Sequence, residues 1–214
     1  MKTMRIGVLA LQGDVEEHLA MLKKCGATAA RNVGRGGSTE EVEAVRVKHV
    51  KDVEAVDALI IPGGESTTIA KLMWASGIAE EVKKRAGEGM PVWGTCAGLV
   101  LLAKKGDEQV KKTGQKLLEL MDFEVGRNAF GRQKESFEAE LDVGGIKKFP
   151  AVFIRAPAIA KVWGDCKVLA RFDGKIVAAE QGNFLATAFH PELSEDARVH
   201  EYFLGKIGRQ EKKR

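Results

Sequence analysis

Short apolar runs separated by polar segments of helical periodicity dominate the pattern of this chain. Residues 4–11 and 56–61 are apolar without strict alternation, as expected for strands that are covered on both faces of a sheet. Residues 91–93 form a third apolar run, which stops at a turn containing glycine. Apolar strands followed by helical segments in this way fit one α/β domain.

Helical spacing follows the first strand. Asp14 is placed to cap a helix that Gly26 ends, and apolar residues recur through it every three or four positions, at Val15, Leu19 and Leu22. After the second strand, Ile69 and its neighbours predict another helix.

Residues 27–52 are less regular. The glycine-rich stretch 34–37 lacks the strand and helix that flank a dinucleotide-binding loop, so we interpret it as a plain turn. Residues 45–50 alternate like an edge strand.

The second half of the chain predicts mainly β structure. Residues 168–172 and 175–180 form a hairpin with its turn at Gly174, whereas the charged stretch 106–115 is predicted to be a loop. A closing helix is expected over residues 194–207, with Ser194 as its cap and its apolar residues on one face.

Composition limits the classes of protein. The chain has 214 residues, of which 44% are hydrophobic, so we expect a single domain over residues 1–214 with a sizeable core. The net charge of +4 comes from 34 basic and 30 acidic residues, and several basic ones lie in residues 208–214, which we interpret as a frayed tail. Aromatic residues make up 6% and lysines alternate with glutamates, so nucleic acid is not an expected partner.

Cysteine usage and hydropathy indicate a cytoplasmic protein. Cys25, Cys96 and Cys166 are an odd number and too widely spaced for a metal cluster, and the chain opens without a leader-like segment. No apolar run approaches the roughly 20 residues of a membrane span. We therefore expect a reducing compartment and no membrane association.

Cys96 lies in a sequence typical of a nucleophile elbow. An apolar approach leads into Gly94-Thr95-Cys96-Ala97-Gly98, and an apolar helix follows. Such a turn presents a side chain on a strained corner with helix N–H groups aimed at it, which favours a thiolate. The alternative is a buried structural cysteine.

His190 and Glu192 supply the other groups that a cysteine nucleophile needs. They lie on either side of Pro191, after the apolar residues 186–189, so an extended strand would point both side chains to one face. Cysteine, histidine and acid would then be nucleophile, base and orienting group. Alternatively, His190 ends a strand without catalytic function and Glu192 is a solvated acid of the last helix.

An oxyanion hole requires backbone N–H groups. The N–H of Ala97 and one from the Gly63-Gly64 loop could form it if these two loops are neighbours in the sheet. The loop ends the second buried strand, where ligands bind in open α/β sheets. Glu65 could make polar contacts there or simply cap the next helix.

Several motifs together carry a family resemblance. The elbow and the His190-Pro191-Glu192 segment resemble those of class I (triad) glutamine amidotransferases. Further stretches resemble the glutaminase subunits of pyridoxal 5'-phosphate synthases, in family order from about Arg5 to Phe203; these are residues 7–13, 62–68, 127–133, 153–157 and 189–193.

The resemblance implies a flavodoxin-like, three-layer α/β fold with a mainly parallel central sheet. It implies hydrolysis of L-glutamine to glutamate and ammonia, with the ammonia passed to a (β/α)8-barrel synthase subunit that builds the cofactor from a pentose phosphate and a triose phosphate. Cys96, His190 and Glu192 would be the triad. We expect neither a metal nor a cofactor in this chain.

The resemblance also assigns substrate contacts. Gly63, Gly64 and Glu65 would hold the glutamine, together with Arg127 and the Ile154-Arg155 pair, and Gln12 is the family position near the oxyanion hole beside Gly63 and Ala97. Arginines suit carboxylate recognition, although each could be an ordinary surface residue without its motif. Residues 27–52 and 106–120 depart from the family pattern, which leaves their contacts open.

Two other functions compete with this interpretation. A free-standing cysteine hydrolase would act without a partner and would not need the segment 127–133. A glutamine-binding regulatory module would be expected to lack a member of the triad, and the sequence contains all three.

Overall fold

The centre of the molecule is a parallel sheet. The computed structural model describes residues 3–31, 41–126 and 136–211, apart from the side chains of residues 27–31 and 208–211. Adjacent strands are parallel throughout this part of the sheet. Their order is β2 (Glu41–Val47), β1 (Thr3–Leu9), β3 (Ala58–Ile61), β4 (Val92–Thr95) and β12 (Phe184–Thr187). With β12 in the fifth position, this is the 2-1-3-4-5 order of flavodoxin-like folds.

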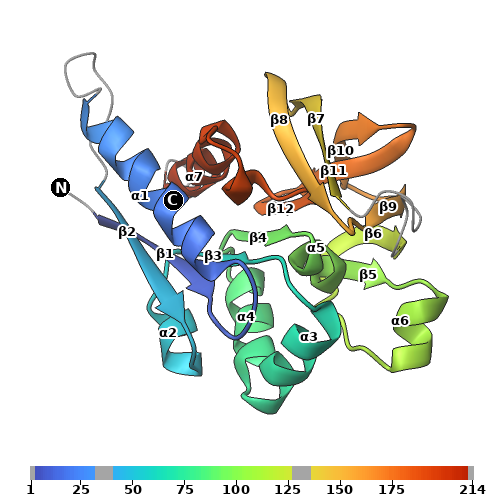
Figure 1. Cartoon of the computed structure of the whole chain (residues 1–214). Coiled ribbons are helices and arrows are strands. Elements are labelled where there is room, and N and C mark those ends of the chain that lie inside the picture. The colour runs from blue at the N-terminus through green and yellow to red at the C-terminus, as the bar shows by residue number, and fades with distance from the viewer. Residues whose placement is uncertain (1–2, 32–40, 127–135, 212–214) are drawn as a thin grey trace.

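Helices cover both faces of this sheet and complete three layers. In Figure 1, α1 (Val15–Arg31) and α7 (Arg198–Glu211) lie on one side of the strands. The opposite side carries α2 (Val50–Glu54), α3 (Ser66–Ala75) and α4 (Ile78–Gly87). Because the sheet is covered on both faces, its inner strands β3 and β4 are buried at every position.

Beyond β12 the sheet becomes mixed. β11 (Lys175–Gln181) pairs antiparallel with β12, and the order continues through β9 (Ala158–Val162), β6 (Met121–Gly126) and β5 (Ala103–Lys105). β10 (Lys167–Phe172) forms a hairpin with β11. A separate hairpin of β7 (Ser136–Val143) and β8 (Ile146–Ile154) stands above the sheet in Figure 1.

Aromatic side chains join these layers. Trp93 of β4 is fully buried and packs against Phe203 of α7, with ring centroids 5.4 Å apart. Under the β7–β8 hairpin, Phe153 contacts Phe189, which directly precedes His190, at 5.7 Å. The core therefore extends to the segment that carries the candidate base.

Two local predictions in the first part of the molecule were wrong. The first helix does not end at Gly26, because this residue avoids the left-handed conformation of a helix terminus and packs against Val42 of β2. A short helix, α6 (Glu108–Thr113), replaces the loop predicted over 106–115, and Asp107 caps it by accepting hydrogen bonds from two backbone N–H groups.

The end of the chain also differs from the expectation. Pro191–Leu193 form a 3-10 turn, η2, instead of continuing a strand, and α7 begins at Arg198, after the predicted cap Ser194. The helix also includes residues 208–211, which the sequence pattern assigned to a frayed tail. The predicted turn at 34–37 lies outside the described residues.

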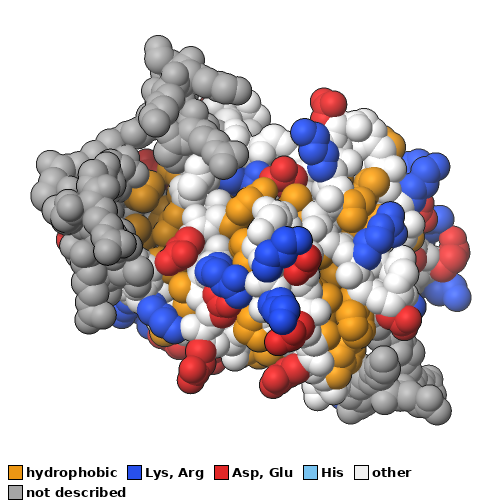
Figure 2. Space-filling model, turned by 90° about the horizontal axis from the view of Figure 1, so that it is seen from above, with side chains coloured by type: hydrophobic (Ala, Val, Ile, Leu, Met, Phe, Trp, Pro, Cys, Tyr) orange, Lys and Arg blue, Asp and Glu red, His pale blue; other side chains and the backbone are white. Residues whose placement is uncertain are grey.

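The surface mixes both signs of charge. On the face seen in Figure 2, Lys and Arg side chains are interspersed with Asp and Glu side chains and with small apolar areas. Within the described ranges, every helix is too short or too polar to span a bilayer.

We expect Phe203→Ala to lower the free energy of unfolding by about 3 to 5 kcal/mol, because it removes a fully buried ring from the contact between α7 and Trp93. Urea denaturation followed by circular dichroism measures this change. Leu72→Ala is the matched control, since Leu72 is already 39% exposed, and it should change stability by no more than about 0.5 kcal/mol. Equal effects of the two substitutions would contradict the packing described.

Candidate active site

Cys96 occupies a strained turn between β4 and α5 (Ala97–Leu102). Its backbone angles, φ 46° and ψ −99°, lie outside the regions that side chains other than glycine usually adopt. Close approach of the backbone explains the neighbouring glycines: a Cβ on Gly98 would lie 2.1 Å from the Ile61 carbonyl oxygen, and one on Gly94 would collide with Gly98. The predicted nucleophile elbow is therefore present in the backbone.

His190 reaches the elbow from the far end of the chain. β12 ends at Thr187, whose carbonyl oxygen accepts a hydrogen bond from the Cys96 N–H at 2.8 Å. The His190 N–H then donates to the Val152 carbonyl oxygen of β8 at 2.7 Å. Two backbone hydrogen bonds thus fix the segment that carries the imidazole beside the elbow.

Glu192 pairs with His190 as the sequence predicted, but through different local geometry. His190 Nδ1 lies 2.7 Å from Glu192 Oε1, and both side chains are buried. The 3-10 turn, opened by Pro191 in its first position, brings the two side chains together, not the alternation of an extended strand.

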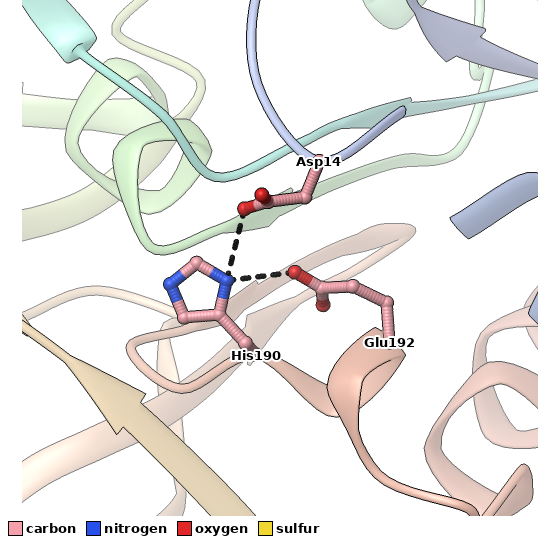
Figure 3. A group of neighbouring side chains, drawn as sticks. All are labelled: Asp14, His190 and Glu192. Atoms are coloured by element: carbon pink, nitrogen blue, oxygen red, sulfur yellow. Dashed lines mark hydrogen bonds and ion pairs between the residues drawn. The ribbon is translucent and has the colours of Figure 1, made fainter. Parts of the chain in front are cut away.

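Asp14 provides a second carboxylate at the same imidazole nitrogen. Its Oδ2 lies 3.2 Å from His190 Nδ1, and Figure 3 shows both acids converging on that one nitrogen, with Nε2 directed away from them. Gly63 borders this contact, because a Cβ there would lie 2.3 Å from His190 Cε1 and 2.8 Å from Asp14 Oδ2.

These contacts favour the charged imidazole. Burial opposes the charge, but the hydrogen bond with Asp14, the neighbouring Cys96 sulfur and the hydrogen bond with Glu192 together raise the pKa of His190 to about 12. Because this folded-state pKa lies above the ordinary value, the charged form persists through neutral pH and is lost only as the pH approaches about 12. Burial raises the pKa of Glu192, whereas its pairing with His190 acts in the opposite direction.

Behind Glu192 lies a buried pair of neutral histidines. His18 Nε2 is 3.3 Å from Glu192 Oε2 and 3.2 Å from Thr95 Oγ1, while its Nδ1 is 3.0 Å from His200 Nε2. Burial lowers the pKa of His18 well below its usual value and lowers that of His200 to about 3. This neutral layer shields Glu192 from solvent without adding charge.

A cavity of about 510 Å³ opens in front of Cys96 and His190. Its size suits a small metabolite. Cys96 Sγ lies at its wall, 3.8 Å from the Ile154 carbonyl oxygen, and Arg155 adopts a positive φ of 41° there, a second strained residue at the same site. The lining residues are Asp14, Gly64, Glu65, Ser66, Cys96, Ala97, Val100, Gln109, Ile154, Arg155, Pro157 and His190.

Most of the other predicted site residues line this cavity: Gly64, Glu65, Ala97, Ile154 and Arg155. β3 and β4 are neighbours, so the Gly63-Gly64 loop and the elbow lie together, as an oxyanion hole requires. The Glu65 side chain caps α3 by accepting a hydrogen bond from the Thr67 N–H. The backbone N–H of Glu65 donates to Gln12 Oε1 at 2.7 Å. Gln12 thereby contacts the loop. Arg127 lies outside the described residues.

Asp14, His190 and Glu192 also form a group with the spacing of metal ligands, since one ligand atom from each lies within 4.8 Å of the others. A cation there would have to displace the pairing of His190 Nδ1 with Glu192 Oε1. The close carboxylate–imidazole contacts therefore favour acid–base chemistry.

Sequence reasoning missed the positions of Asp14, His18 and His200 in the site. Asp14 follows the first strand and precedes a helix, so it was interpreted as a cap. No local signal in the sequence could place it against His190, because the contact joins opposite ends of the chain.

Comparison with known proteins shows which family contains this chain. A family model described as the SNO glutamine amidotransferase family matches residues 8–209. The chain belongs to this family. Among its relatives, a protein of Archaeoglobus fulgidus named "Pyridoxal 5'-phosphate synthase subunit PdxT" is 56% identical over 205 residues, which cover 96% of this chain and 98% of the relative. A protein of the same name from Methanocella arvoryzae is 54% identical over 202 residues, covering 94% and 96% of the two chains.

Solved structures agree with this family membership. A structure described as "Crystal structure of glutamine amidotransferase" has a TM-score of 0.83 and 46% identity, covering 95% of this chain and 98% of that one. "Structure of PurLQS from Thermotoga maritima" has a TM-score of 0.61 at 16% identity, covers 97% and 100% of the two chains, and supports the fold alone. The predicted family and the flavodoxin-like α/β fold are confirmed.

Selective alkylation tests the chemistry of the thiols. Burial raises the pKa of Cys25 to about 12 and of Cys166 to about 11, so both stay protonated and unreactive at pH 8. Cys96, beside the imidazolium and the cavity, should alone be modified by iodoacetamide in the folded chain, with a rate that falls at least tenfold in His190→Ala. Mass spectrometry of digested peptides identifies the modified residue, and preferential labelling of Cys25 or Cys166 would contradict the assignment.

Proposed function

We propose that this chain hydrolyses L-glutamine to L-glutamate and ammonia and delivers the ammonia to a synthase that makes pyridoxal 5'-phosphate. The observation that carries the proposal is the contact of His190 with Glu192 beside a strained Cys96 at the wall of a metabolite-sized cavity. Membership of a glutamine amidotransferase family supports the reaction, and the names of the relatives support the product.

In the first half-reaction, the Cys96 thiolate attacks the side-chain amide carbon of glutamine. A protonated His190 beside the sulfur stabilises the thiolate and then gives its Nε2 proton to the leaving nitrogen, so that ammonia departs and a thioester remains. The orientation in Figure 3 suits these roles, since the carboxylates hold Nδ1 and leave Nε2 for proton transfer.

In the second half-reaction, His190 is neutral because it has given up a proton. It accepts a proton from water, and the resulting hydroxide attacks the thioester carbon. The C–S bond breaks, glutamate leaves, and the thiolate–imidazolium pair is restored. Glu192 stabilises each imidazolium and keeps the ring oriented without transferring a proton.

Backbone groups and arginines complete the substrate site. The Ala97 N–H at the start of α5 and an N–H of the Gly63-Gly64 loop would stabilise the oxyanion, with Gln12 holding that loop through Glu65. Gly63, Gly64, Glu65 and the Ile154-Arg155 pair would position the amino-acid end of glutamine, and Arg127 would bind there as well.

The partner of this chain would be a (β/α)8-barrel synthase subunit. The relatives are named as subunits of pyridoxal 5'-phosphate synthase, which supports an enzyme of more than one component. Ammonia released into water would be lost to protonation and dilution, so it would have to pass directly from this chain to the synthase subunit.

Loss of the nucleophile should abolish the reaction. We expect Cys96→Ala to lower ammonia release by at least about 10³-fold, with His190→Ala nearly as severe and Glu192→Gln milder, because the last residue orients but transfers no proton. Coupled glutamate dehydrogenase measures the glutamate formed, and circular dichroism checks the fold. Substantial turnover by a well-folded Cys96→Ala variant would refute the nucleophile.

The synthase subunit should activate the chain. Docking beside Gln12 and the Gly63-Gly64 loop would favour the conformer whose N–H faces the substrate, and one such donor is worth about 10² to 10³ in rate. Titration of the synthase into a steady-state glutaminase assay measures this effect, and pyridoxal 5'-phosphate should form from glutamine only when both proteins are present. Full activity of the isolated chain, unchanged by mixing, would favour a free-standing cysteine hydrolase.

A further inference from the structure

We infer that Asp14 is a second orienting carboxylate for His190, which shares the Nδ1 proton with Glu192 and so acts as a positioning residue. The inference rests on the proposed glutaminase function for its catalytic consequence. Its structural part, a contact of 3.2 Å between two side chains from opposite ends of the chain, is independent of the reaction.

The turn that carries Asp14 is rigidly joined to the site. The Asp14 N–H donates to the Gly63 carbonyl oxygen at 3.2 Å, and Gly13 has a φ of 108° that glycine adopts readily. A Cβ on Gly13 would lie 1.7 Å from that same Gly63 oxygen, so the two turns are in direct backbone contact. The backbone of Asp14 is therefore held at a fixed position relative to the loop, and its carboxylate reaches His190 from there.

The two acids approach His190 from different surroundings. The Glu192 carboxylate is fully buried behind the imidazole, whereas 35% of the Asp14 side chain is exposed toward the cavity. Among the described residues, the titratable groups that interact with His190 are Asp14 from the turn before α1, Glu192 from η2, Cys96 from the elbow and the neutral His18 from α1. Asp14 is the one carboxylate of this set that also contacts the substrate cavity.

Two carboxylates at one N–H provide redundancy. Glu192 makes the shorter contact, 2.7 Å against 3.2 Å, and is the main partner of the ring. When its charge is removed, the Asp14 carboxylate still accepts from Nδ1 and keeps the proton on that nitrogen, which leaves Nε2 available for proton transfer. The effects of removing each acid are therefore coupled, in contrast to those of independent sites.

A spectroscopic test decides the contact without reference to activity. The His190 Nδ1–H proton, observed by NMR in ¹⁵N-histidine-labelled protein at pH 7, should move upfield in Asp14→Asn, because a strong acceptor becomes a weak one. Glu17→Gln, which removes a neighbouring exposed carboxylate from α1, is the matched control and should leave the resonance in place. Equal positions of the resonance in the two variants would overturn the inference.

A double-mutant cycle tests the catalytic part. We expect Asp14→Asn to lower kcat by about threefold to tenfold with a smaller change in KM, whereas a residue that only binds substrate would mainly raise KM. Asp14→Asn combined with Glu192→Gln should lose at least tenfold more activity than the product of the single losses. Losses that simply multiply would contradict the shared role.

The two arms separate this inference from the proposed function. A wild-type chain that lacks glutaminase activity would refute the proposed function while the NMR arm still decides whether Asp14 holds His190. An active wild type with an unmoved Nδ1–H resonance in Asp14→Asn would refute the role of Asp14 alone.

Discussion

The hydrogen bond from the Cys96 N–H to the Thr187 carbonyl oxygen, 2.8 Å long, joins the two halves of the site. It continues the parallel pairing of β4 with β12 by one residue beyond the last strand position, Thr95. The elbow begins at that point on one strand, and on the other the chain turns toward His190. Strain at the Cys96 backbone is sustained because this bond and the close contact of Gly98 with Ile61 leave the turn no room to relax.

The family, the fold and the pairing of His190 with Glu192 were accessible from the sequence because each depends on local patterns. Uniformly apolar runs predicted strands buried on both faces, and small residues around Cys96 predicted a turn that only glycine neighbours permit. His190 and Glu192 are close in sequence, so several local conformations bring them together. The predicted conformation, an extended strand, was wrong. The predicted pairing is present because the 3-10 turn after His190 also brings the two side chains together.

Contacts between distant segments were not accessible in the same way. Asp14 has the sequence context of a helix cap, and its position against His190 depends on the backbone contact between Gly13 and Gly63. His18 follows the helical pattern of an ordinary core residue, although its ring lies behind Glu192. Gly26 was misread as a helix end, since the packing that makes glycine acceptable inside α1 comes from β2.

The position of β12 has a consequence for how the protein is made. This strand lies in the interior of the sheet, between β4 and β11, yet it is the last strand in the described part of the chain. A ribosome adds about 5 to 20 residues per second, so the elbow leaves it about 5 to 20 seconds before His190 does. During that interval the nascent chain has a gap in its sheet and a cysteine without its base. The thiol and its base therefore come together only after the segment that carries His190 has been synthesised, so a shorter nascent chain cannot release ammonia by this route.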